Sequence, residues 1–381
     1  MRSRCLRTHA LITESLGLLL VSTATDRSLY KSLRMSLWRA MQTAAPQAEQ
    51  GEYTDPQDLP PLDMSDWDPT CRDAFVSPEM TSFVDALRVE SRSVRDSVLA
   101  DLAEHYDMTP EQARQACLKW EETSVDEWRS TNASDSDAGR VEFYRTTQSW
   151  SFDLSWWAYL QAEGRATPSN VMALRFTQQY APGRRHLDFG SGIGVTSQLF
   201  ARNGWSSTSA DLSSTLLDFA RFRHKRRGDD ISYIDLHTEK LPAGAYDAIT
   251  AIDTLAHVPD VYSACRELHA ALGPDGILVA NFDIRAAAPE TEWHLYDDDL
   301  RPIYDLRRAG FVPIGTVGYG MVGYRKVATH GIGHHLRVLG AWLTFVSPPR
   351  RTARALGKPV LRSLLKLRTR LRGHDGSSES R

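Results

Sequence analysis

The sequence predicts an α/β fold with a doubly wound, mostly parallel sheet, and three features indicate it. An apolar strand at residues 186–189 runs into glycines at the alternate positions 190, 192 and 194, and then into a helix. Residues 246–253 form a nearly continuous apolar run, which a central parallel strand needs because helices cover both of its faces. Helical periodicity alternates with these strands, which is the order that produces a parallel sheet.

The first 70 residues are predicted to be a poorly ordered extension with an acidic linker. Residues 10–21 are apolar and follow arginines, as in a signal peptide, but Glu14 interrupts the run and it is too short to cross a membrane. Met35 and Met41 are alternative starts of the chain. Residues 44–69 are rich in Pro, Asp, Gln and Glu, which predicts a disordered linker.

Residues 71–180 are predicted to form a helical bundle. Ser77 before Pro78 and Thr109 before Pro110 are typical of helix starts, and apolar residues follow at spacings of three and four. The last part of this segment, residues 141–160, is unusually aromatic.

The alternating core is predicted to occupy residues 181–328. After the glycines, a helix is expected at residues 216–226, a strand at 231–235 and the long apolar strand at 246–253. An amphipathic helix at 261–272 is expected to end at the turn 273–276, followed by a strand at 277–282. A helix at 300–309 and paired strands at 311–317 and 320–326 complete the core.

The glycine loop carries a more specific signal. Asp188 precedes the glycines, which gives Asp-x-Gly-x-Gly-x-Gly, and Asp211 follows about 17 residues after the last glycine. This pattern resembles motif I of the class I S-adenosylmethionine (SAM)-dependent methyltransferases, and the resemblance to the small-molecule members extends over residues 184–326. It implies SAM as cofactor and a Rossmann-like sheet of seven strands that ends in an antiparallel hairpin, with a helical lid before it.

The resemblance also implies cofactor-binding positions. Asp211 is expected at the ribose hydroxyls, with a helix cap as the alternative role. Asp188 is expected near the methionyl ammonium, or as a brace that accepts backbone hydrogen bonds. Asp235 is expected at the adenine, with His237 and Glu239 as alternatives. The full predicted set is Asp188, Gly190, Ser191, Gly192, Gly194, Asp211, Leu212, Asp235 and Asp253.

Methyl transfer needs mainly alignment of the acceptor, but a hydroxyl acceptor must lose a proton. His257 and His294 are the candidate bases, because one follows the long apolar strand and the other follows the next strand. A histidine that only orders its loop is the alternative. Tyr144, Arg145 and Trp150 are candidates for a lid over the substrate, against simple core packing. No metal site is predicted, since His330, His334 and His335 lack a cysteine or paired carboxylate at ligand spacing.

Residues 329–381 are predicted to be a basic helical extension. From residue 348 to 372 the chain has nine Lys or Arg and no acid, although the net charge of the whole chain is −3. Leucines at helical spacing predict an amphipathic helix within residues 350–372, which suits an anionic membrane surface, RNA phosphates or packing on its own core. The four cysteines have no framework spacing, so a cytoplasmic protein is expected, with peripheral contact at the inner membrane face as an option.

Three functions follow from these observations. The first is SAM-dependent O- or N-methylation of a small-molecule acceptor. The second is RNA methylation, although no base-flipping signature follows the long apolar strand. The third is SAM binding without turnover. The sequence predicts neither the acceptor nor the oligomeric state.

Overall fold

The computed structural model describes residues 55–58, 64, 67–283, 285, 291–296, 300–318 and 320–327. The chain divides into two compact units, one of Met1–Ala40 with Gly340–Arg381 and one of Met41–Leu339, and every described residue belongs to the second. The predicted signal-like segment and basic tail helix lie outside the described residues. In the predicted acidic linker, the short 3-10 helix η1 (Pro56–Asp58) follows Asp55, which is buried and pairs with Arg95 at 2.7 Å.

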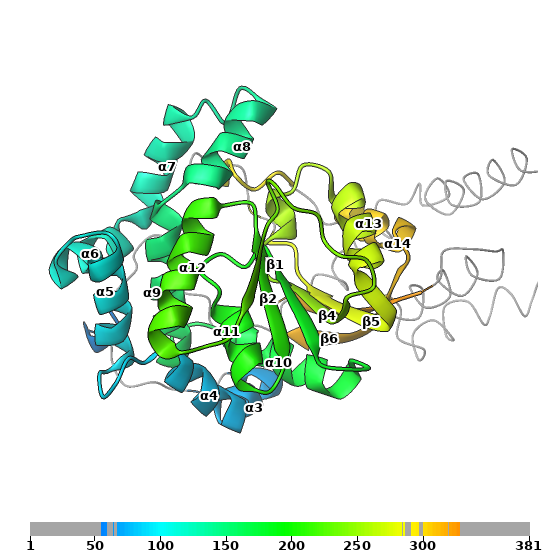
Figure 1. The fold of residues 1–381 in the computed structure, drawn as a ribbon, viewed down its shortest axis with the longest axis horizontal. Helices are drawn as coiled ribbons and strands as arrows, with labels where there is room; N and C mark the ends of the chain where they lie inside the picture. The colour runs from blue at the N-terminus through cyan, green and yellow to red at the C-terminus, as the bar shows by residue number, and fades with distance from the viewer. Residues whose placement is uncertain are drawn as a thin grey trace, which may run out of the picture. The chain divides into compact units, whose positions relative to one another are not determined.

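One sheet of seven strands forms the centre of the unit, in the order β3-β2-β1-β4-β5-β7-β6 (Figure 1). Strands β1 to β5 pair in parallel, while β7 pairs antiparallel with both β5 and β6. The predicted fold class is confirmed, including the hairpin at one edge. The strands are β1 Arg185–Phe189, β2 Ser206–Asp211, β3 Ser232–Asp235, β4 Tyr246–Ala251, β5 Leu272–Ala280, β6 Phe311–Gly318 and β7 Met321–Lys326.

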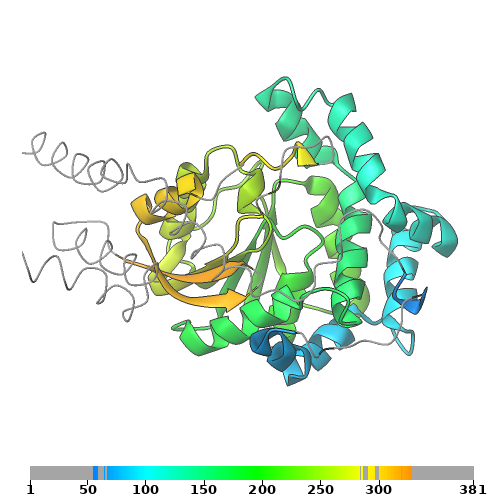
Figure 2. The same ribbon diagram turned by 180° about the vertical axis from the view of Figure 1, so that it is seen from behind.

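Helices cover both faces of this sheet, so most residues of β4 and β5 are buried on both sides. In Figures 1 and 2 the sheet lies between α11 and α12 on one side and α13 and α14 on the other. Helix α10 enters before β1 and packs on α11 and on β5 and β6. These helices are α10 Ser169–Tyr180, α11 Val195–Arg202, α12 Ser214–Arg227, α13 Val261–Ala271 and α14 Leu300–Arg308.

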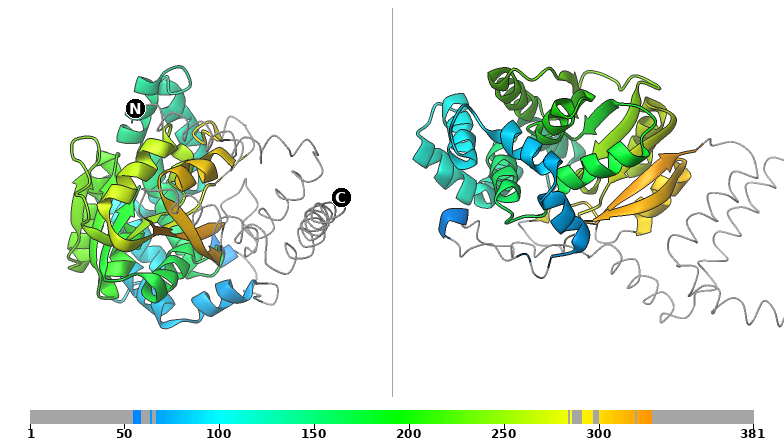
Figure 3. Two further views of the ribbon diagram at one scale, coloured as in Figure 1. Left: turned by 90° about the vertical axis from the view of Figure 1, so that its right-hand side faces the viewer. Right: turned by 90° about the horizontal axis from the view of Figure 1, so that it is seen from below.

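The helices that precede the sheet pack on one another and on α12. Figure 3 shows the cyan helices α5 to α8 at the end of the unit opposite the β6–β7 hairpin, whereas α3 and α4 pack on α10 and α3 also contacts β6. Ser77 and Thr109 cap helices as the sequence predicts, each accepting a hydrogen bond from the backbone N–H three residues later. The helices are α3 Pro69–Phe75, α4 Pro78–Leu87, α5 Val94–His105, α6 Pro110–Leu118, α7 Trp120–Ser130, α8 Asp137–Thr146 and α9 Ser149–Ala162.

One predicted boundary is wrong. Strand β5 begins at Leu272 instead of residue 277, so the expected turn at 273–276 lies within the strand. Leu272 pairs with Tyr246, and the register then shifts before Ala248 pairs with Ile277. Asp275 takes a positive φ of 55°, so the turn residues form an irregularity in a paired strand. Within the described residues, no helix combines the length and apolar character that a membrane crossing requires.

Candidate functional site

The three predicted glycines form a tight loop between β1 and α11. Gly190, Gly192 and Gly194 all have left-handed φ values, at 70°, 53° and 73°, which other residues adopt only at a cost. The Gly190 and Ser191 N–H groups both donate to the carbonyl of Ala210, at 2.8 and 3.1 Å. The loop is therefore tied to the end of β2, the strand that carries Asp211.

Asp188 lies under this loop and is almost completely buried. Its Oδ1 accepts a hydrogen bond from Thr250 at 2.9 Å, and its Oδ2 accepts one from the backbone N–H of Ser197 at 3.1 Å. The second bond ties the carboxylate to the first turn of α11, so the bracing contact that the sequence leaves as an alternative is present. Burial raises the pKa of Asp188 to about 7, against these two hydrogen bonds.

Asp211 stands at the end of β2. Its Oδ2 accepts a hydrogen bond from the N–H of Gly192 at 2.7 Å, and its Oδ1 accepts one from the N–H of Ser213 at 2.8 Å. The carboxylate therefore holds the glycine loop and the start of α12 together, while its remaining lone pairs stay available to a ligand. Leu212 follows it, half-buried.

Asp235 ends β3 and lies in register with Asp211, so the two predicted acids are neighbours at the carboxyl edge of the sheet. Its Oδ1 accepts from the N–H of His237 at 2.9 Å, and its own N–H donates to Glu239 at 3.3 Å. The three alternatives for the adenine position thus form one small turn.

A pocket of about 90 Å³ lies beside the glycine loop. Five predicted residues line it, namely Asp188, Gly190, Ser191, Gly192 and Asp253, whereas Gly194, Asp211, Leu212 and Asp235 do not. Its other side consists of residues from α9 and α10 that the sequence did not single out, among them Leu154, Trp157 and Asn170. They follow a helical core pattern, so nothing in the sequence distinguishes them from ordinary packing residues.

Asp253 follows β4 in a left-handed conformation, with φ of 51°. Its N–H donates to Asn281 Oδ1 at 2.7 Å, and the Asn281 amide donates to its carboxylate in return. This reciprocal pair joins the ends of β4 and β5 and fixes the carboxylate at the pocket wall.

The two candidate bases, 37 positions apart in sequence, lie side by side, with ring centroids 4.7 Å apart. His257 Nδ1 donates to the carbonyl of Trp293 at 2.8 Å. Burial, with a smaller contribution from His294, lowers the pKa of His257 to about 4, so His257 is neutral near pH 7.

His294 has an acidic partner that the sequence analysis missed. Its Nε2 lies 3.3 Å from Asp283 Oδ2, while its Nδ1 is buried with no hydrogen-bond partner. Although burial opposes ionisation, the bond from His294 and the charge of Arg285 hold the pKa of Asp283 well below its usual range. Asp283 comes three residues after the end of β5, a position typical of functional residues in such sheets.

The predicted lid residues divide into two kinds. The rings of Tyr144 and Trp150 lie 6.1 and 5.5 Å from that of His257, and the Tyr144 hydroxyl donates to the carbonyl of Trp293 at 3.0 Å. Arg145, by contrast, pairs with Glu142 on its own helix at 2.8 Å. An aromatic wall therefore covers the two histidines, and the Arg145 side chain has a local partner. Among the described residues, no group of His, Cys, Asp and Glu is arranged to hold a metal ion.

Comparison with known proteins agrees with this geometry. The methyltransferase domain family matches residues 187–280, which run from β1 to the end of β5. The ubiquinone biosynthesis O-methyltransferase of Bordetella avium is 30% identical over 175 residues, which cover 39% of this chain and 72% of that enzyme. The chain belongs to the class I SAM-dependent methyltransferases.

Two further matches cover different shares of the proteins concerned. The ubiquinone biosynthesis O-methyltransferase of Histophilus somni is 33% identical over 137 residues, and the match spans 32% of this chain and 56% of that enzyme. A SAM-dependent methyltransferase structure from Mesorhizobium loti has 21% sequence identity and a TM-score of 0.33, with 42% of this chain and 98% of that chain covered. This methyltransferase is an enzyme that uses SAM.

Proposed function

We propose that this methyltransferase methylates a hydroxyl oxygen on an aromatic small molecule. The observation that carries the proposal is His294, whose Nε2 lies against Asp283 while its buried Nδ1 has no partner. A hydroxyl acceptor must lose its proton, and a neutral imidazole with a free ring nitrogen can take it. The relatives in Bordetella avium and Histophilus somni carry the name of O-methyltransferases.

The aromatic wall supports the choice of acceptor. Trp150, Trp293 and Tyr144 pack around the two histidines with ring centroids 5.5 to 6.5 Å apart. Flat aromatic side chains suit a flat aromatic ligand, since offset and edge contacts between rings add to the burial of apolar area. Aromatic hydroxyls also lose their protons more readily than aliphatic ones, so one histidine is sufficient as base.

In this proposal SAM binds across the glycine loop. Asp188 takes the ammonium end, Asp211 the ribose and Asp235 the adenine edge, with Ser191, Leu212 and Asp253 lining the path. Gly192 fits the group, because its missing Cβ would point at Leu154 in the pocket and glycine leaves this space open. When bound, SAM supplies both the methyl group and the leaving group.

Side chains of helix α9 must move for the cofactor to bind. Leu154 and Trp157 close a pocket of about 90 Å³, well below the roughly 300 Å³ at which clefts for larger ligands begin. A Cβ built on Gly192 would lie 2.5 Å from Leu154 Cδ1, so this side chain fills the space directly over the loop. Leu154 and Trp157 therefore belong with Tyr144 and Trp150 in the proposed lid.

The roles of the histidines are then distinct. His294 is the base, and Asp283 orients its ring through Nε2. His257 is held neutral and donates its Nδ1 hydrogen to Trp293, so it keeps the aromatic wall in place beside His294.

The experiment compares His294→Ala, His257→Ala and His269→Ala. The acceptors are catechol and phenol, with aniline as the nitrogen analogue, and binding of S-adenosylhomocysteine is measured in parallel. His294→Ala should lower turnover of the hydroxyl acceptors by about 100-fold or more and leave S-adenosylhomocysteine binding unchanged. His269, which lies on α13 and bonds the backbone carbonyl of Val327, is the matched control and should show no loss. Equal turnover in wild type and His294→Ala would exclude His294 as the base.

A further inference from the structure

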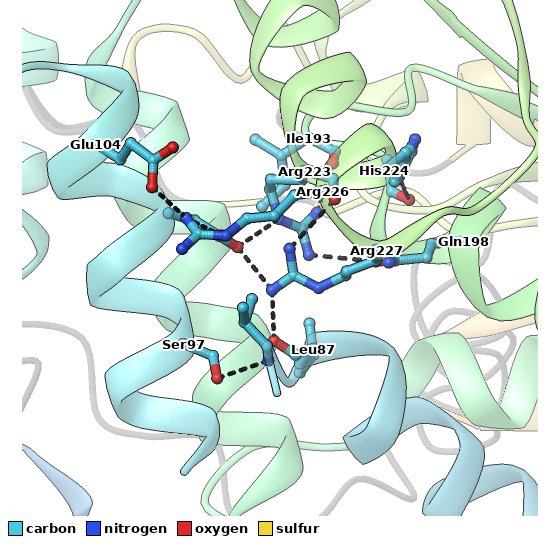
Figure 4. Close-up of polar contacts among 12 residues, drawn as sticks. Leu87, Ser97, Glu104, Ile193, Gln198, Arg223, His224, Arg226 and Arg227 are labelled. Carbon is cyan, nitrogen blue, oxygen red and sulfur yellow. Dashed lines mark hydrogen bonds and ion pairs between the residues drawn. The ribbon is translucent and has the colours of Figure 1, made fainter. Parts of the chain in front are cut away.

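Two consecutive residues of α12 bond consecutive carbonyls of the glycine loop. Arg223 donates through Nη1 to the carbonyl of Ile193 at 2.7 Å, and His224 donates through Nε2 to the carbonyl of Gly194 at 2.9 Å. Both side chains are almost completely buried, and Figure 4 shows them converging on the loop. They fix the loop from the side of α12.

The chemistry of His224 is defined by these contacts. A carbonyl only accepts, so Nε2 carries the hydrogen. Burial lowers the pKa of His224 to about 3, so the ring is neutral and its Nδ1 accepts from the Tyr233 hydroxyl at 2.7 Å. A Cβ on Gly194 would lie 2.4 Å from His224 Cε1, which shows how closely α12 and the loop approach.

The other side of Arg223 faces the helices before the sheet. Its Nε lies 3.6 Å from Asp101 Oδ2 on α5, and Asp101 is only 1% exposed. The same carboxylate pairs with Arg227 at 2.7 Å and Arg226 at 3.3 Å. Asp101 is thus a buried anion that three arginines of α12 share, namely Arg223, Arg226 and Arg227.

Glu104 lies one turn from Asp101 on α5 but differs in what it touches. It pairs with Arg226 at 2.8 Å, and its side chain is 59% exposed (Figure 4). The two acids of α5 therefore differ in their connection to the loop, since Asp101 contacts Arg223 and Glu104 contacts the outer arginine.

We propose that Arg223 is a positioning residue for the cofactor loop, and that Asp101 couples the docking of α5 to SAM binding. The inference rests on the cofactor site proposed above. Arg223 also donates to Gln198 Oε1 at 3.3 Å, so one guanidinium contacts the loop, the next turn of α11 and α5 together. Without Asp101 the charges of Arg223 and Arg227 repel each other in a buried space, and Arg223 is no longer held against the Ile193 carbonyl.

The test compares Asp101→Asn with Glu104→Gln as matched control. Both remove one acid from the same helix with little change of shape. Titration calorimetry with S-adenosylhomocysteine should show affinity about tenfold weaker in Asp101→Asn and unchanged in Glu104→Gln. A tenfold change in affinity is within the usual range for the coupling between two sites. The measurements are made at a temperature where circular dichroism shows all three proteins folded. Wild-type affinity in folded Asp101→Asn would overturn the inference, even if its melting temperature had dropped.

Hydrogen exchange on the wild-type protein provides a second test that does not depend on the folding of a variant. Coupling is reciprocal, so S-adenosylhomocysteine should slow amide exchange in α5, Val94–His105. Glu104→Gln should retain this protection. Unchanged exchange in α5 despite binding would overturn the inference alone, whereas no binding by wild type would overturn the proposed cofactor site as well.

Discussion

Gly192→Val tests whether the glycine loop is a cofactor site or only a tight turn. A β-branched residue at the φ of 53° found here costs about 1–2 kcal/mol in backbone strain. The nearest atom to a new Cβ is Leu154 Cδ1 at 2.5 Å, which is the end of a flexible side chain and can move. The fold should therefore survive, while the valine occupies the space proposed above for the cofactor.

Gly244→Val separates these two effects. Gly244 has a similar φ of 65°, and a Cβ there would meet nothing within 4 Å, so it shares the backbone strain without the steric conflict. Both variants should lose similar stability in a thermal melt, but only Gly192→Val should lose binding of S-adenosylhomocysteine in calorimetry, by at least 100-fold, or about 2.7 kcal/mol. Equal affinity of the two variants would refute a cofactor role for the loop.

Three further predictions concern other residues. Asp211→Ala should weaken S-adenosylhomocysteine binding by about 1–3 kcal/mol in calorimetry, and unchanged affinity would leave the acid as a cap only. Burial raises the pKa of Asp188 from 3.8 to about 7. As the pH rises through this interval, the unfolded chain loses this proton before the folded protein does, so the free energy of unfolding falls. Asp188→Asn should therefore gain thermal stability over wild type between pH 5 and 8, and a constant difference would contradict the buried-acid explanation. A chain that ends at Ser347 should keep cofactor binding but lose salt-sensitive co-sedimentation with anionic vesicles, while an insoluble product would indicate that the tail is part of the fold.

The fold was predictable because each of its signals is local. A strand, three glycines and a helix lie within ten residues, and the apolar run of β4 is visible without knowledge of its neighbours. The boundary of β5 was not predictable, because residues 273–276 have turn composition and form an irregularity between two positions, Leu272 and Ile277, that pair with β4. The pairing of Leu272 depends on a long-range contact that the local sequence does not show.

The candidate site was predicted in part for the same reason. Both histidines follow strands, so their meeting follows from the topology of the sheet. Asp101 lies more than a hundred residues from Arg223, and α12 also carries Arg221, Arg226 and Arg227, all alike in sequence. Only packing against α5 decides that Arg223 is buried while Arg221 is exposed. Such a selection depends on long-range contacts that one sequence does not reveal.

The order of the strands gives the site a direction. The chain moves outward from β1 through β2 to β3 and then crosses to β4 on the other side of β1, so the loops after β1 and β4 diverge and leave a crevice between them. Gly190 and Asp253, which line the pocket, come from these two loops. The predicted adenosine residues lie on the β2 and β3 side, while His257 and His294 follow β4 and β5. A methyl group carried at the crevice would thus lie between the cofactor half and the acceptor half of the sheet.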